Sequence, residues 1–253
     1  MPFRAYLLII LFASAHTRYI PTNVREFYNS VVAQGSCNSP LQSGFYDIVH
    51  DDDNSFAYCG DHLDDYGIMY LQGRKGKLAN MDIDCDGLIT ENDDGRCDNA
   101  HSVQNMTAMR RYVSSYRNGV PDLNPFVHNY VVFGNTGVKT GWVTFDPRTY
   151  GMKPLSVMAI VYGVWGDTNG DDGENPRIGE ASISVATLCF GHDFEDEVGF
   201  NEEKILYIGF TGTEAVPGPN ASWMAKDENE FESSISSLGD RLVERIGGYD
   251  IGH

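Results

Sequence analysis

Positive charge is scarce in this sequence. Its 253 residues include 18 Lys and Arg against 36 Asp and Glu, which gives a formal net charge of −18. Nucleic acid is therefore not expected as a partner, because binding to a phosphate backbone depends on clustered Lys and Arg. An acidic surface can serve solubility alone, or an acidic cleft can attract a polycationic substrate. Composition leaves both interpretations open.

The sequence also lacks the motifs of several common enzyme classes. Its His and Cys residues do not have the spacing of a zinc site. It contains neither a G-x-S-x-G motif nor a glycine-rich loop for phosphate. Zinc chemistry, serine hydrolases and nucleotide-dependent enzymes are thus without support, and we expect neither a metal nor another cofactor.

Long apolar runs are rare, and the clearest one lies at the start of the chain. Residues 1–15 combine a charged MPFR segment, the apolar run YLLIILFA and the small residues Ala13, Ser14 and Ala15. This pattern predicts a secretory signal peptide. The run is too short to cross a hydrocarbon layer of roughly 30 Å, so a membrane protein is not expected. We expect a secreted, extracellular protein in which residues 16–253 form a single domain.

The chain has five cysteines, and an oxidising compartment would permit disulfides among them. An odd number leaves at least one cysteine unpaired. We expect a Cys85–Cys97 disulfide, because the two residues flank a short loop rich in Asp and Gly that closes at small entropic cost. The sequence does not determine the pairing of the others.

The pattern of apolar residues predicts a β-rich α+β fold. Helical spacing predicts one helix that is capped by Asn23 and ends at Gly35, one over 104–118 and one from about Phe231 to Gly247. Runs of apolar, β-branched and aromatic residues predict strands in GIMYL, FVHNYVVFG, GWVTF, PLSVMAIVYGVWG and KILYIGF. Few helices beside many short strands favour a single domain with a barrel-like sheet and a few flanking helices over a doubly wound sheet.

Two carboxylates follow glycines in the segment YGVWGDTNGDDGENPRIGEAS. Asp167 comes after an apolar strand and Gly166, and Glu180 comes thirteen residues later between Gly179 and an apolar segment. A returning loop could bring the two across a groove, which is the arrangement that glycosidic bond cleavage needs. Asp167 could equally be a turn residue and Glu180 a charge at a helix end. Spacing alone does not decide between these interpretations.

A second acidic segment, from Asp82 to Thr90, begins like the calcium loop of an EF-hand. Its twelfth position is Asp93 where Glu is expected, and three glycines interrupt the preceding segment where a helix would have to lie. An acidic loop that lines a groove for a cationic substrate explains the same residues. A secreted calcium-binding protein built round this loop stays as an alternative.

The segments YCGDHLDDYGIMYLQG, NMDIDCDG, PDLNPFVHNYVVFGN, KPLSVMAIVYGVWGDTNG and GEASISVATLCFG together resemble the fungal chitosanases of glycoside hydrolase family 75. The resemblance implies an enzyme that hydrolyses the β-1,4 bonds of chitosan internally and with inversion. Separately, we expect the protein to be a monomer. The resemblance also implies a sheet resembling the double-psi barrel of family 45 cellulases. The catalytic pair would be Asp167 and Glu180. Apart from the resemblance, Tyr162 and Trp165 flank acidic or glycine-rich stretches and could offer faces to sugar rings, with core packing as the default interpretation of aromatics in strands. The residues expected to contact substrate are Asp82, Asp84, Asp86, Tyr162, Trp165 and Asn169.

Inversion requires one protonated and one ionised carboxyl group, about 6.5–9.5 Å apart. The apolar residues beside Glu180 favour it as the general acid, and the polar turn expected round Asp167 favours the latter as the general base. The reverse assignment remains open. A sugar-binding protein on a hydrolase scaffold that has lost activity is a further alternative.

Overall fold

The computed structural model describes residues 19–47, 54–90, 93–98, 103–159, 161–170, 175–192 and 199–247. The expected signal peptide at 1–15 lies outside these ranges. The helices are α1 (Thr22–Gln34), α2 (Arg110–Ser115), α3 (Ile183–Phe190) and α4 (Glu228–Val243). The strands are β1 (Pro40–Phe45), β2 (Phe56–Cys59), β3 (Ile68–Gln72), β4 (Ala79–Asp84), β5 (Tyr130–Asn135), β6 (Val157–Ala159), β7 (Gly163–Asn169), β8 (Glu180–Ser182), β9 (Phe200–Ile205) and β10 (Ile208–Phe210).

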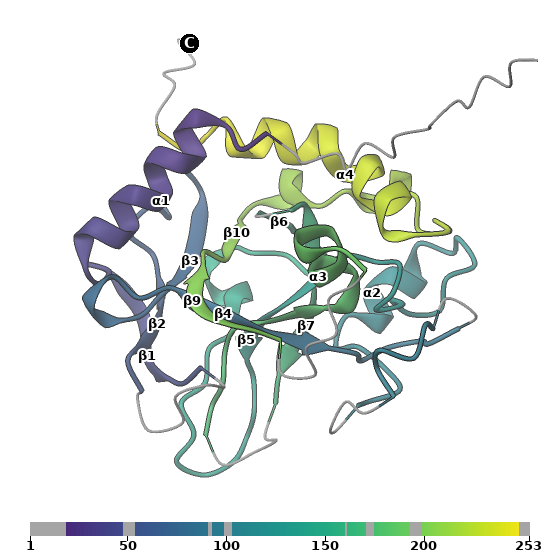
Figure 1. Cartoon of the computed structure of the whole chain (residues 1–253), viewed down its shortest axis with the longest axis horizontal. Coiled ribbons are helices and arrows are strands. Elements are labelled where there is room, and N and C mark those ends of the chain that lie inside the picture. Colours follow the sequence, from purple (N-terminus) through teal and green to yellow (C-terminus); the bar gives the residue numbers. More distant parts are fainter. Residues whose placement is uncertain are drawn as a thin grey trace, which may run out of the picture.

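The strands form one ten-stranded mixed sheet in the order β1-β2-β3-β10-β6-β7-β5-β8-β4-β9. Strand β5 lies between β7, to which it is parallel, and β8, to which it is antiparallel. Figure 1 shows α1 and α4 together along one side of the molecule, and α3 over the middle of the sheet. The β-rich α+β prediction is confirmed. No pairing between described residues joins β1 to β9, so the closed barrel is not confirmed.

The first and last predicted helices are confirmed as α1 and α4, with one difference at Asn23. Phe27 and Val31 are the buried residues of α1, and the helix ends at Gly35, which has a φ of +83°. Asn23 does not cap this helix. It lies in the first turn, and its Nδ2 donates to the carbonyl oxygens of Val243 (2.7 Å) and Ile246 (2.8 Å). It therefore satisfies carbonyl groups at the end of α4 instead.

The predicted helix over 104–118 is wrong for its first half. Only Arg110–Ser115 are helical, because the backbone N–H groups of the preceding segment donate to carboxylates elsewhere in the chain. The predicted strand GWVTF is also absent, and its one pairing is an isolated bridge between Phe145 and Asn135. The remaining predicted strands correspond to β3, β5, β6, β7, β9 and β10.

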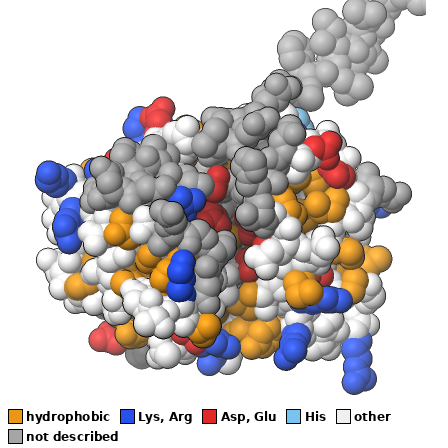
Figure 2. All heavy atoms as spheres, turned by 90° about the horizontal axis from the view of Figure 1, so that it is seen from below, with side chains coloured by type: hydrophobic (Ala, Val, Ile, Leu, Met, Phe, Trp, Pro, Cys, Tyr) orange, Lys and Arg blue, Asp and Glu red, His pale blue; other side chains and the backbone are white. Residues whose placement is uncertain are grey.

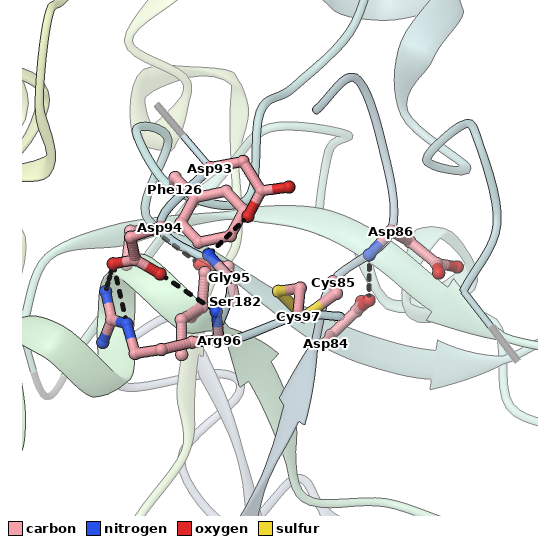
Figure 3. The surroundings of a disulfide bond; sticks show 12 residues. Asp84, Cys85, Asp86, Asp93, Asp94, Gly95, Arg96, Cys97, Phe126 and Ser182 are labelled. Carbon is pink, nitrogen blue, oxygen red and sulfur yellow. Dashed lines mark hydrogen bonds and ion pairs between the residues drawn. A yellow bond between two sulfur atoms is a disulfide. The ribbon is translucent and has the colours of Figure 1, made fainter. Parts of the chain in front are cut away.

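The predicted disulfide between Cys85 and Cys97 is confirmed, with a Cα–Cα distance of 6.0 Å. A second disulfide joins Cys37 to Cys59, and Cys189 is free. Figure 3 shows Cys85 between Asp84 and Asp86, just after the end of β4. The disulfide ties this acidic segment to the loop at 93–98.

Candidate active site

Asp167 and Glu180 occupy the same register position on strands either side of β5. Val132 of β5 pairs with Asp167 of β7 and also with Glu180 of β8. Residues that stand opposite one another in a sheet project from the same face. Two inter-strand spacings place the two Cα atoms roughly 10 Å apart. The sheet therefore presents both carboxylates on one face, separated by one strand.

A β-bulge at Gly166 produces this register. Val131 pairs with Trp165, whereas Val132 pairs with Asp167, so Gly166 is the extra residue of β7. A Cβ at this position would lie 2.4 Å from the Cβ of Tyr130 and 2.5 Å from Cδ1 of Leu123. Only glycine fits here, and the bulge shifts Asp167 by one position along the sheet.

The carboxyl group of Asp167 is buried, with 6% of the residue exposed. Its Oδ1 accepts the N–H groups of Thr168 (2.7 Å) and Ala108 (3.1 Å), while its Oδ2 has no hydrogen-bond partner among the described residues. Burial raises the pKa of Asp167 to about 8, the two N–H groups oppose this rise, and the charges of Asp86 and Glu180 add to it. The polar turn expected round Asp167 is wrong, because the residue lies within a strand.

Glu180 is half-buried and is oriented by Asn169. The Nδ2 of Asn169 donates to Oε1 of Glu180 (3.0 Å) and to the carbonyl oxygen of Arg177 (2.9 Å). Gly179, just before Glu180, has a φ of +94°, and a Cβ there would lie 2.7 Å from Oδ1 of Asn80. Asn169, expected to contact substrate, thus lies against one of the two candidate catalytic carboxylates.

Asp82 and Asp84 on β4, and Asp86 just after its end, extend the row of carboxylates. Asp82 pairs with Glu180 in the parallel β4–β8 ladder. Burial raises the pKa of Asp82 to about 6, opposed by the N–H of Ile83 and the charge of Arg177. Burial, with the charges of Asp167 and Asp86, raises the pKa of Asp84 well above its usual range. We call Asp82, Asp84, Asp86, Asp167 and Glu180 the acidic group.

Backbone N–H groups bind Asp84 and Asp86, the two members of the acidic group at the end of β4. The N–H of Asp86 donates to Oδ1 of Asp84 (2.7 Å), and the N–H of Gln104 donates to Oδ1 of Asp86 (2.6 Å). Figure 3 shows the Asp84 carboxylate beside the Asp86 backbone. Figure 2 shows acidic side chains gathered in a hollow in the middle of one face, with Lys and Arg on the surrounding surface. Burial raises the pKa values of Asp82, Asp84 and Asp167, so protonated and ionised carboxyl groups can lie side by side in this group.

Two aromatic residues expected to contact sugar, Tyr162 and Trp165, are buried. Tyr162 is 4% exposed, and its hydroxyl donates to Oδ1 of Asp240 in α4 (2.9 Å). Trp165 is 1% exposed, and its Nε1 donates to the carbonyl oxygen of Asp167 (2.8 Å). Trp165 therefore supports the backbone at Asp167 from within the core.

The structure does not favour an EF-hand at the Asp82 loop. Asp82 and Asp84 belong to strand β4, which leaves no entering helix. Among the described residues, the group of acidic, His or Cys side chains close enough to share a metal ion is Cys37, Cys59 and Asp61. Its two cysteines form a disulfide.

The backbone donors that contact the acidic group could not be predicted from the sequence. The N–H groups of Gln104 and Ala108 come from a segment with helical apolar spacing, and any residue type can supply a backbone N–H. Asp122, which accepts the N–H of Thr107 in the same segment, was not among the predicted site residues. Its position between the prolines of PDLNPF was the one sequence feature that could have pointed to Asp122. Asp side chains in such irregular segments often bind nearby backbone groups.

Comparison with known proteins identifies the family. Residues 81–245 match the model described as fungal chitosanase of glycosyl hydrolase group 75. Over 245 residues the chain is 42% identical to Endo-chitosanase B of Aspergillus oryzae, covering 94% of this chain and 96% of that protein. It is 43% identical over 249 residues to an Endo-chitosanase of Aspergillus oryzae, with 94% and 97% covered. It is 41% identical over 244 residues to an Endo-chitosanase of Aspergillus fumigatus, with 94% and 95% covered.

A search of the solved structures gives no significant match. None of the helices in the described ranges has the length and apolar character needed to span a bilayer. The family match covers the acidic group, and the matched relatives cover nearly the whole chain. This chain therefore belongs to the fungal chitosanases of glycosyl hydrolase group 75.

Proposed function

We propose that this protein is a secreted endo-chitosanase that cleaves the β-1,4 bonds of chitosan by a single inverting displacement. Asp167 acts as the general acid and Glu180 as the general base. The observation that carries the proposal is the pairing of a buried carboxyl, whose pKa is raised to about 8, with a second carboxylate across Val132. The relatives named endo-chitosanases support the substrate class, and the expected signal peptide supports secretion.

In the proposed reaction, Asp167 donates its proton to the glycosidic oxygen as the bond from that oxygen to the anomeric carbon breaks. Glu180 takes a proton from a water molecule, whose oxygen attacks the anomeric carbon from the opposite face. Asp167 ends ionised and Glu180 ends protonated, and exchange with solvent restores both. The N–H that Asn169 donates to Glu180 favours the ionised carboxylate that a general base requires.

The acidic group also supports selection of a cationic polymer. Each free amine of chitosan carries a positive charge when protonated, whereas the acetylated sugar of chitin carries none. Ammonium groups close to Asp82 and Asp84 would stabilise the ionised form of these two carboxyls, whose pKa values are raised by burial. Opposite charges attract more strongly in a partly desolvated site than on an open surface.

Incubation of the protein with chitosan oligomers and chitin oligomers of equal length tests this function. We expect chitosan oligomers to be cut internally and much faster, and we expect a chelator to leave the rate unchanged. Proton NMR in the first minutes should show the α-anomer, because one displacement inverts the β-linkage once. A β-anomeric first product would exclude the single displacement, and equal rates on chitin would exclude the proposed selectivity.

A further inference from the structure

Asp122 is a buried carboxylate that the proposed reaction does not use. It is 3% exposed and lies in the segment between α2 and β5. Its Oδ2 accepts the N–H of Thr107 (3.0 Å), and its Oδ1 accepts the hydroxyl of Thr107 (2.6 Å) and the N–H of Leu123 (2.8 Å). Two of these three donors belong to Thr107, so Asp122 fixes both the backbone and the side chain of that residue.

The residue after Thr107 contacts the candidate general acid. The N–H of Ala108 donates to Oδ1 of Asp167 at 3.1 Å. Because a peptide unit is planar, the direction of this N–H depends on how Thr107 is held. Asp122 is therefore linked to Asp167 through Thr107 and Ala108. Asp122 binds Thr107, and the next residue, Ala108, donates its N–H to Asp167.

The other end of the same segment is also attached to the acidic group. The N–H of Gln104 donates to Oδ1 of Asp86 (2.6 Å), and the N–H of Gly87 donates to the carbonyl oxygen of Gln104 (3.0 Å). Residues 104–108 thus connect Asp86 to Asp167 through backbone donors. The segment has no regular structure of its own up to α2, so its shape depends on these side-chain anchors.

We infer that Asp122 is a positioning residue for Asp167, and that it acts by holding the Thr107–Ala108 peptide so that the Ala108 N–H meets Oδ1. The inference rests on the proposed acid role of Asp167. Its effect is to keep one carboxyl oxygen bound, which leaves Oδ2 as the oxygen that carries the proton. Loss of Asp122 should weaken one of the two N–H donors that hold Oδ1 and favour the ionised form of Asp167, which leaves Thr168 as the remaining donor.

Other charged and titratable groups also act on Asp167. Asp86, Asp84 and Tyr130 face it from the end of β4 and from β5, and Glu180 faces it from β8. These carboxylates all favour the protonated form of Asp167, so the backbone donors are what oppose them. Removal of the Ala108 donor should therefore shift the titration of Asp167 to higher pH.

The test compares Asp122→Ala with the milder Thr107→Val and with two controls. Thr107→Ser keeps the hydroxyl, and Asp227→Ala removes a different carboxylate that caps α4 by accepting the N–H of Glu230 (2.8 Å). For each protein the pH dependence of kcat/KM on chitosan oligomers is measured. The titration of Asp167 is followed independently by carbon-13 NMR of its carboxyl group.

For Asp122→Ala we expect a loss of kcat/KM of roughly ten- to a hundredfold and an upward shift of the basic limb by about one pH unit. Thr107→Val should shift the basic limb of the pH profile in the same direction but by a smaller amount. If Asp122→Ala does not fold, the shift in Thr107→Val tests the inference. Thr107→Ser and Asp227→Ala should leave the limb in place.

An unchanged Asp167 titration in both Asp122→Ala and Thr107→Val would overturn the inference. An equal shift in Asp227→Ala would do the same, because it would trace the effect to general loss of stability. Inactivity of the unaltered protein on chitosan would instead count against the proposed function, and the NMR titration would still decide the role of Asp122.

Discussion

Replacing Asp167 with Asn should stabilise the folded protein at neutral pH while abolishing chitosan cleavage. Asn has almost the same shape as Asp but carries neither charge nor acidic proton. The folded protein raises the pKa of Asp167 from 3.8 to about 8, chiefly by burial. Between these two values the unfolded chain holds Asp167 ionised, whereas the folded protein must keep it protonated or bury a charge.

The sign and size of the effect follow from this difference. Below pH 3.8 Asp167 does not lower the free energy of unfolding. Between pH 3.8 and about pH 8 it lowers the free energy of unfolding progressively, and above about pH 8 the reduction stays constant. At pH 7 the penalty is about 4 kcal/mol, since each pH unit above 3.8 costs about 1.4 kcal/mol. Asp167→Asn removes this pH-dependent penalty, so its melting temperature should exceed that of the unaltered protein by roughly 10 °C at pH 7.

Thermal unfolding of both proteins from pH 4 to pH 8 measures the difference. We expect the gap in melting temperature to widen steadily across this range. Asp146→Asn is a matched control with the opposite sign, because hydrogen bonds from Arg148 lower the pKa of Asp146 and its ionised form stabilises the fold. A gap that does not change with pH would refute the reasoning, since Asp167 would then titrate alike in the folded and unfolded chain.

Three further results are expected. Asn169→Ala should move the acidic limb of the pH profile of kcat/KM to higher pH, because it removes the N–H donated to Glu180; an unchanged limb would contradict its orienting role. Joint replacement of Cys85 and Cys97 by Ser should lower the free energy of unfolding by about 3 kcal/mol, as expected for a short closed loop, and urea titration with the disulfide-intact protein as reference measures this. Binding of a chitosan oligomer to inactive Glu180→Gln should release protons, because ammonium groups favour ionised carboxylates; calorimetry in buffers of different ionisation enthalpy would show identical heats if no protons were released.

The sequence predicted those features that depend on residues close together in the chain. The family resemblance rested on contiguous segments and is confirmed by the comparisons. The Cys85–Cys97 disulfide was predictable because only a short loop separates the two residues. Helices α1 and α4 followed from their apolar spacing, which is a local property.

Features that depend on contacts between distant segments were not predicted. The segment at 104–108 has helical apolar spacing, yet its N–H groups bind carboxylates that lie elsewhere in the chain, and these bonds replace helical ones. Tyr162 and Trp165 flank acidic and glycine-rich residues in the sequence, which suggested a role in sugar binding. Their burial depends on the packing of α4 and of the core.

The sequence by itself determined that Asp167 and Glu180 each follow a glycine at the boundary of an apolar segment. Only the tertiary structure decided that both stand opposite Val132, because register depends on the bulge at Gly166 and on strand pairing across the sheet. It also determines the burial that raises the pKa of Asp167. The neighbours of Asp167 in sequence are polar, but its neighbours in space are the core and other carboxylates, and it is the spatial neighbours that set the cost of ionisation.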